Sequence, residues 1–224
     1  MTSIKICGIR DVEIALVIGQ AGADYLGLVF ADSPRMATPE GALQIIEKVH
    51  QRKLHPAVVG VFANMEAEEL NRVAEYCQLD YVQLSSDETW EYCRKIRKPI
   101  IKTIHIHKNK AITDILSEIE TGYRLLRGKS LIYLLDTKVG DVYGGTGQTF
   151  DWQVAKEVCS RFPVIIAGGL TPENVGRLVG EVKAWGVDVS SGVESNGQND
   201  LSKIRSFITA VRKAECNPGS PEGP

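Results

Sequence analysis

The hydrophobic and polar positions of this chain repeat one pattern. A short apolar segment is followed by a corner of glycine or polar residues, and then by a longer segment with apolar residues three and four positions apart. The apolar segments predict buried strands, and the longer segments predict amphipathic helices with one apolar stripe each. The expected strands lie at residues 4–7, 24–30, 58–62, 81–84, 100–106, 131–135, 164–167 and 187–189.

This alternation predicts an α/β fold with a parallel sheet, because strands that are apolar along their whole length are buried on both faces. About eight units follow one another without a linker that would separate two domains. That number favours a closed (β/α)8 TIM barrel, a single domain over residues 1–214. The alternative is an open flavodoxin-like or Rossmann sheet, which usually needs only about five or six strands. Residues 215–224 are rich in proline and glycine and are expected to form a disordered C-terminal tail.

Length, charge and cysteine content narrow the functional classes. The chain has 224 residues and a formal net charge of −2, so it offers no broad basic surface for nucleic acid or an anionic membrane. We expect no signal core at the N-terminus, no membrane-spanning segment and no fused partner. Five cysteines without a Cys-x-x-Cys pair indicate reduced thiols and a cytoplasmic protein.

Two corners near the C-terminus are candidates for a phosphate site. Small residues follow the last two expected strands, namely Gly168, Gly169, Ser190, Ser191 and Gly192. The sequence Thr-Pro-Glu at 171–173 predicts that a helix begins directly after the first corner, with Thr171 as its cap. Glycine lets backbone N–H groups approach a phosphate closely, and a helix N-terminus adds partial positive charge. Such corners after the last two strands are typical of the phosphate site of a (β/α)8 barrel.

Cys7 and Asp136 are the candidates for acid–base chemistry, because each ends an expected strand at the rim where barrel active sites lie. A thiolate can act as a base, and Lys5 is expected to lower the pKa of the Cys7 thiol towards neutrality. Burial at the end of an apolar strand would raise the pKa of Asp136 and make it a general acid. The two strands lie well apart around the ring, so the two groups are expected to flank a substrate. The alternatives are an ordinary buried cysteine and an aspartate that caps a loop.

Other groups near this rim have two interpretations each. Arg35 either binds a carboxylate through its guanidinium fork or is a solvated loop residue. His105 and His107 have a metal-like spacing, but no acidic residue completes the set, which favours a structural role and no metal site. Lys102 either forms a Schiff base or, as we favour, pairs with a neighbouring carboxylate in the barrel. The glycine-rich segment 144–147 is expected to be a mobile active-site loop.

Taken in order, these segments resemble one enzyme family. The set is KICGI (5–9), SPR (33–35), VQL (82–84), LDT (135–137), GGTG (144–147), FDW (150–152), AGGL (167–170) and GVDVSSG (186–192). Each motif alone is weak, but the ordered set covers the chain to about residue 214 and is highly specific. It resembles phosphoribosylanthranilate isomerase, the Amadori isomerase of tryptophan biosynthesis.

The resemblance implies a reaction and roles for individual residues. The family converts N-(5-phosphoribosyl)anthranilate to 1-(2-carboxyphenylamino)-1-deoxyribulose 5-phosphate by general acid–base catalysis, the third step from chorismate to tryptophan. It implies Asp136 as the acid, Cys7 as the base and Arg35 as the residue that binds the anthranilate carboxylate. It further implies substrate contacts from Gln83 and Asp188, and phosphate contacts from Gly145, Gly168, Gly169, Ser190, Ser191 and Gly192. The implied enzyme is a cytoplasmic monomer or homodimer that binds a small anionic sugar phosphate and needs no metal or other cofactor.

The chain departs from the family pattern at two places. It has Ser85-Ser86 where the family usually has His-Gly, and Met36-Ala37 where the family has an aromatic or β-branched pair. The first change leaves open a broader isomerase that also acts on the aminoimidazole ribotide of the histidine pathway. A metal-dependent pentose-phosphate epimerase and indole-glycerol-phosphate synthase would need ligands or catalytic residues that we cannot place. A non-catalytic barrel that binds a sugar phosphate is disfavoured because both the acid and the base are present.

Overall fold

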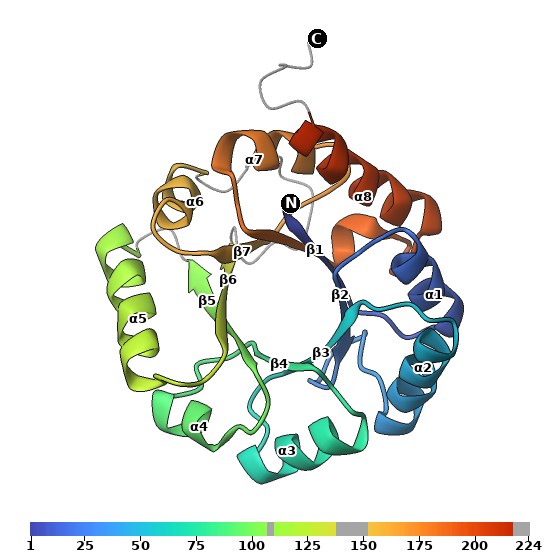
Figure 1. Ribbon diagram of the computed structural model, residues 1–224, viewed down its shortest axis with the longest axis horizontal. Helices are drawn as coiled ribbons and strands as arrows, with labels where there is room; N and C mark the ends of the chain where they lie inside the picture. Colours follow the sequence, from blue (N-terminus) through green and yellow to red (C-terminus); the bar gives the residue numbers. More distant parts are fainter. Residues whose placement is uncertain (107–109, 138–151, 217–224) are drawn as a thin grey trace.

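The computed structural model describes residues 1–106, 110–137 and 152–216 and contains a closed barrel of eight parallel strands (Figure 1). The strands follow one another in chain order, and β1 pairs with β8 to close the ring. They are β1 (Ser3–Cys7), β2 (Tyr25–Val29), β3 (Ala57–Phe62), β4 (Tyr81–Leu84), β5 (Ile100–Ile106), β6 (Leu131–Thr137), β7 (Val164–Ala167) and β8 (Gly186–Val189). The expected (β/α)8 barrel is therefore confirmed.

A helix follows each strand, and the helices cover the outside of the barrel (Figure 1). They are α1 (Val12–Gln20), α2 (Pro39–Gln51), α3 (Ala67–Tyr76), α4 (Trp90–Lys95), α5 (Ile112–Leu125), α6 (Trp152–Cys159), α7 (Val175–Val182) and α8 (Leu201–Cys216). A short helix η1 (Ser191–Val193) and a hairpin of β9 (Glu194–Ser195) and β10 (Gln198–Asn199) lie between β8 and α8. The hydrophobic pattern does not predict this insertion.

Local side-chain chemistry explains where the helices begin. Asp11 caps α1 by accepting from the N–H groups of the second and third residues that follow it. Thr38 caps α2, with Pro39 in the first turn. The regular helix α7 begins at Val175 rather than directly after the first corner, although Thr171 makes the expected cap contact by accepting from the Glu173 N–H through Oγ1. The Asn174 side chain accepts from the Thr171 N–H at 2.8 Å and holds the preceding residues in a turn.

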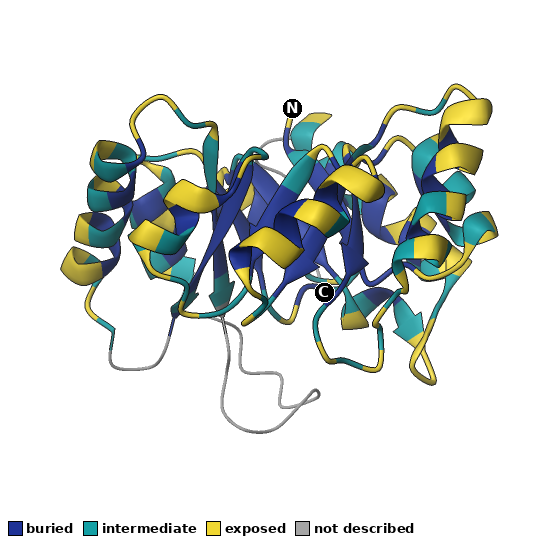
Figure 2. Cartoon of the chain, turned by 90° about the horizontal axis from the view of Figure 1, so that it is seen from below, coloured by how far each residue is buried: buried dark blue, intermediate teal, exposed yellow. Residues whose placement is uncertain are grey.

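Two apolar layers lie on either side of the barrel wall. Inside the barrel, a small cluster contains Tyr25, Val59, Ile101, Leu134 and Ile165. The larger cluster lies between the strands and the apolar stripes of the helices. Figure 2 shows the buried strands in the centre of the molecule and the exposed residues on the outer surfaces of the helices.

The strand register brings chemically active side chains to one rim. Side chains alternate between the two faces of a strand, so Lys5 and Cys7 both lie on the inner face of β1. The apolar interior cluster separates these two residues from the opposite rim of the barrel. Lys5 lies opposite Asp188 on β8, and His105 on β5 lies opposite Asp136 on β6. β6 extends to Thr137, so Asp136 is the last but one residue of the strand and not its end. All four positions lie towards the carboxyl ends of their strands or just below them.

The C-terminal helix is longer than the sequence pattern predicts. α8 continues to Cys216, so the first two residues of the expected tail are helical, and residues 217–224 lie outside the described part. Within the described part, no helix has both the length and the apolar character needed to cross a bilayer.

Candidate active site

A buried ion pair lies beside the Cys7 thiol in the middle of the barrel. Lys5 Nζ lies 3.0 Å from Asp188 Oδ1, and both side chains are almost completely shielded from solvent. Gly27 on β2 lies opposite Cys7, and a Cβ atom at Gly27 would come within 2.8 Å of the Cys7 sulfur. The missing side chain of Gly27 therefore makes room for the thiol.

The expected direction of the Cys7 pKa is wrong. Burial raises the pKa of the Cys7 thiol, and the Asp188 carboxylate adds to this, whereas Lys5 only partly opposes them. Burial disfavours the Lys5 ammonium, but the facing Asp188 carboxylate and the thiol outweigh it and raise the pKa of Lys5. The Lys5 ammonium is therefore a single buried cation that interacts with two acidic groups, the Asp188 carboxyl and the Cys7 thiol. Burial thus disfavours the Cys7 thiolate, and Lys5 opposes this effect while it is also paired with Asp188.

We expect Lys5→Met to lower the free energy of unfolding by about 3–5 kcal/mol, because it leaves the Asp188 carboxylate in the interior without its cation. Urea denaturation followed by circular dichroism measures this loss. The matched control is Arg161→Met, which breaks an exposed pair with Glu157 and should cost less than about 1 kcal/mol. Equal losses in the two variants would show that the buried pair contributes no more to the free energy of unfolding than the exposed pair does.

Asp136 faces the barrel interior next to His105. Nδ1 of His105 lies 3.6 Å from Oδ2 of Asp136, and Nε2 lies 3.1 Å from the backbone oxygen of Ser85. The Asp136 side chain is 30% exposed, so the deep burial expected at this strand end is not found. The carboxyl group is instead accessible from the rim, which is where a substrate would enter. It also lies near enough to Asp188 for the two carboxylates to repel each other.

The described residues contain no group of three or more histidine, cysteine, aspartate or glutamate side chains that could hold a metal ion. His105 contacts Asp136 and Ser85, whereas His107, its candidate partner, lies outside the described residues.

Arg35 makes a bidentate contact through one edge of its guanidinium group. Its Nε and Nη2 atoms lie 2.6 and 2.7 Å from the two carboxylate oxygens of Glu194, which is only 7% exposed. The Arg35 chain passes over Gly8, where a Cβ atom would lie 2.6 Å from Arg35 Cδ. The interpretation of Arg35 as a solvated loop residue is therefore wrong. Glu194 belongs to the unexpected hairpin, and no pattern in the sequence links it to Arg35.

The two corners after β7 and β8 pack against each other. A Cβ atom at Gly192 would lie 1.8 Å from the carbonyl oxygen of Leu170, so only glycine fits there. Gly168 and Gly169 have φ angles of +95° and +63°, which turn the backbone sharply after β7. Ser190 and Ser191 begin the second corner, where η1 starts.

The backbone around the first corner differs from the expected helix start. Asn174 Nδ2 donates to the Gly169 carbonyl oxygen, while its Oδ1 accepts from Thr171. The corner is thus a side-chain-stabilised turn and not a regular helix N-terminus. Gly145, the remaining expected phosphate contact, lies outside the described residues.

Polar side chains continue along the inner rim from β4 to β5. Gln83 is buried, and its Nε2 atom donates to Ser85 Oγ at 3.0 Å. Ser85 Oγ lies 3.5 Å from Thr103 Oγ1. Gln83 is thus held beside the rim by Ser85. Ser85, which departs from the family pattern, is part of a row of polar side chains that runs from Gln83 to Thr103.

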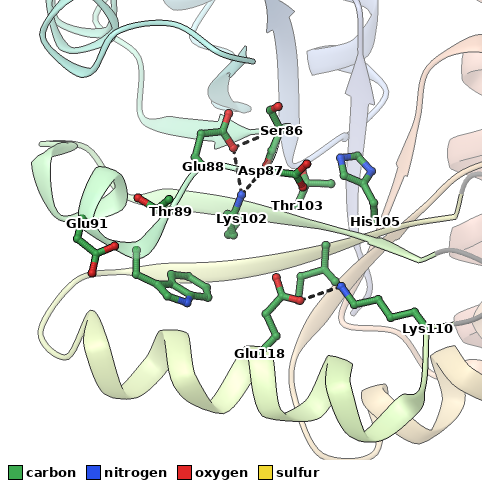
Figure 3. A pocket seen from close by; sticks show the side chains of 12 residues that line it. Ser86, Asp87, Glu88, Thr89, Glu91, Lys102, Thr103, His105, Lys110 and Glu118 are labelled. Carbon is green, nitrogen blue, oxygen red and sulfur yellow. Dashed lines mark hydrogen bonds and ion pairs between the residues drawn. The ribbon is translucent and has the colours of Figure 1, made fainter.

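Lys102 faces the helices rather than the barrel interior. Its Nζ atom donates to Glu88 Oε2 at 3.0 Å and to the Ser86 carbonyl oxygen at 2.6 Å, and both charged side chains are buried (Figure 3). A cavity of about 730 Å³ lies alongside, with the Lys110–Glu118 pair on its wall (Figure 3). The favoured interpretation, a pair with a carboxylate, is confirmed, but the pair lies outside the barrel wall.

Several known proteins that are similar to this chain share one description. Residues 4–210 match the family described as N-(5′-phosphoribosyl)anthranilate (PRA) isomerase. A relative of that name from Dehalococcoides mccartyi is 46% identical over 217 residues, which cover 97% of this chain and 99% of the relative.

Two crystal structures give the same result. One, described as mutually generated monomers of the dimeric enzyme of this name from Thermotoga maritima, has a TM-score of 0.77 and 37% identity, and the match covers 95% of this chain and 100% of that one. The other, the enzyme in complex with reduced 1-(o-carboxyphenylamino)-1-deoxyribulose 5-phosphate, has a TM-score of 0.77 and 36% identity with the same coverage.

Proposed function

The chain belongs to the N-(5′-phosphoribosyl)anthranilate isomerase family, and we propose that Asp136 and Cys7 perform its acid–base chemistry. The protein converts N-(5′-phosphoribosyl)anthranilate into 1-(o-carboxyphenylamino)-1-deoxyribulose 5-phosphate in tryptophan biosynthesis. The observation that carries the proposal is the presence of two proton-exchanging groups on the inner face of one rim, Asp136 on β6 and Cys7 on β1. β7 and β8 lie between them in the ring.

The two groups divide the reaction into a proton donation and a proton removal. Asp136 gives a proton to the furanose oxygen, and the bond between this oxygen and C1′ breaks to leave an iminium ion. The Cys7 thiolate then removes the proton from C2′, which the adjacent iminium makes acidic. The Lys5 ammonium lies next to the thiol and stabilises the thiolate when it forms.

Separate groups are proposed to bind the two ends of the substrate. The backbone at Gly168, Gly169 and Gly192 forms the packed corners proposed to bind the phosphate, together with Ser190 and Ser191. Arg35 is proposed to bind the anthranilate carboxylate. Because Glu194 already holds the guanidinium group, the substrate meets an arginine whose position is set in advance.

Gln83 and Asp188 are proposed to contact the part of the substrate between these ends. Both are buried on the inner face of the barrel, and each is held by a hydrogen bond, Gln83 to Ser85 and Asp188 to Lys5. Their oriented polar atoms suit the hydroxyl groups of a sugar.

We expect Arg35→Lys to raise KM by about 10- to 100-fold with a smaller effect on kcat, because an ammonium cannot make the two parallel hydrogen bonds of a guanidinium group. Steady-state kinetics over a range of substrate concentrations separates the two parameters. Arg52→Lys, an exposed change at the end of α2, is the matched control and should leave both unchanged. A wild-type KM in Arg35→Lys would contradict the assignment of the carboxylate site.

The direct test of the function is the continuous fluorescence assay of freshly prepared N-(5′-phosphoribosyl)anthranilate with the purified protein. Conversion to the aminodeoxyribulose product supports the proposal, whereas tight binding without conversion would indicate the non-catalytic barrel. The aminoimidazole ribotide of the histidine pathway, added in a parallel assay, tests the broader isomerase.

We further propose that the reaction takes place in the cytoplasm, since all five cysteines are free thiols, as is usual in a reducing compartment. The oligomeric state is proposed to be a monomer or a homodimer, and the dimeric Thermotoga maritima relative supports the second.

A further inference from the structure

His105 bridges the corner after β4 and the proposed acid on β6. β5 and β6 pair with His105 directly opposite Asp136, so both side chains lie on the inner face of the rim. Nδ1 of His105 lies 3.6 Å from Asp136 Oδ2, and Nε2 lies 3.1 Å from the Ser85 backbone oxygen. The imidazole is therefore held through Nε2 and faces the Asp136 carboxyl group with Nδ1.

The two ring nitrogens of His105 have different neighbours. A backbone oxygen only accepts hydrogen bonds, so Nε2 carries a hydrogen and donates it to Ser85. Nδ1 points at the Asp136 carboxyl group, and a hydrogen on Nδ1 gives a donor for the carboxylate that Asp136 becomes once it has given up its proton. Hydrogen bonds of catalytic groups are often long in ligand-free enzymes, which fits the separation of 3.6 Å.

The surroundings of Asp136 make this donor important. Among the described residues, Asp188 also interacts with Asp136 through space, but it is already paired with Lys5. Ser85, which anchors the imidazole, is itself held by Gln83 through its hydroxyl group. The His105 ring is thus fixed from one side and directed at the acid from the other.

We propose that His105 is a positioning residue for the general acid. It orients the Asp136 carboxyl group and donates a hydrogen bond to the carboxylate that forms during the reaction. The proton leaves the Asp136 carboxyl group for the furanose oxygen, the electron pair of the C1′–O bond moves to that oxygen, and His105 shares the hydrogen on Nδ1 with the carboxylate without giving it up. The inference rests on the proposed role of Asp136 as the acid.

Two substitutions separate this role from a merely structural one. The side-chain amide of His105→Asn reaches about as far as Nδ1, so it can still donate to Asp136. The longer amide of His105→Gln reaches about as far as Nε2, so it can keep the bond to Ser85 but not the one to Asp136. The matched control is His50→Gln, an exposed change at the end of α2.

We expect His105→Gln to lower kcat by about 10- to 100-fold, part of the 10²- to 10⁴-fold that a general acid supplies, with KM almost unchanged. His105→Asn should keep kcat within about fivefold of wild type, because the donor to the carboxylate is retained. Calorimetric titration with reduced 1-(o-carboxyphenylamino)-1-deoxyribulose 5-phosphate should give the same affinity in all variants, which shows that the barrel and its binding groups are intact.

Three results would overturn the inference. They are wild-type kcat in both variants, an active Gln variant with an inactive Asn variant, and equal losses in both. The first means that the imidazole is not needed, the second that only the tether to Ser85 matters, and the third that donation to Asp136 does not explain the effect. Asp136→Asn is measured alongside. If it stays active, the proposed acid is wrong, whereas if it is inactive and His105→Gln is active, only the inference fails.

Discussion

For Asp136→Asn we expect kcat to fall by about 10²- to 10⁴-fold while KM changes little, because asparagine keeps the shape of the side chain but has no proton to give. The furanose ring opens only if its oxygen is protonated as the C1′ bond breaks. Asp136 is the acid on the inner rim that is accessible to solvent, with 30% of its side chain exposed. The loss should therefore appear in the chemical step rather than in binding.

The fluorescence assay measures this loss under saturating substrate. Asp87→Asn is the control, because Asp87 is an exposed aspartate in the β4–α4 loop on the same side of the barrel. It should keep wild-type kcat. If Asp136→Asn retained more than about a tenth of wild-type kcat, the general acid would have to be another group.

Cys7→Ser is expected to reduce kcat to a similar extent, by about 10²- to 10⁴-fold. A serine hydroxyl is a much weaker acid than a thiol, so it supplies almost no anionic base near neutral pH. Cys216→Ser, an exposed change in the last residue of α8, is the matched control for the chemical substitution. Activity that is indifferent to Cys7→Ser would assign the base to another residue.

The pH dependence gives a second readout of the same base. Because burial raises the pKa of the Cys7 thiol, the thiolate becomes abundant only at higher pH. kcat/KM should therefore rise as the pH rises and the thiolate forms. Lys5 opposes the effect of burial on the thiol. Lys5→Met is therefore expected to raise the pKa of Cys7 further and to move the rising limb of kcat/KM to higher pH. A limb that moves to lower pH would contradict this electrostatic role.

Strand positions were predictable because burial leaves a direct trace in the sequence. β4, β5 and β7 have the expected bounds, since a strand between two apolar layers is apolar at nearly every position. The first residue of α7 was not predictable, because the residues after Thr171 form a turn, held by the Asn174 side chain, before the regular helix begins at Val175. The β9–β10 hairpin was missed because two-residue strands are too short to produce a period.

The candidate site divides in the same way. Cys7, Arg35 and Asp136 were identifiable because they interrupt apolar segments or belong to ordered motifs near strand ends. Glu194 was not, and the pairing of His105 with Asp136 was not, because neither leaves a local pattern. Sequence position indicates which groups lie at the rim, but not which atoms meet there.

The amino-acid sequence by itself determined the eight strand–helix units, their order and the residues at the strand ends, because these depend on local periodicity and on short motifs. Only the tertiary structure decided which charges pair. Lys5 meets Asp188 from 183 positions away, and Arg35 meets Glu194 from 159 positions away. These contacts exist because β1 pairs with β8 and closes the ring, and electrostatic energy depends on distance in space and on burial. For the same reason the pKa of Cys7 lies above its ordinary value although a lysine stands two residues away.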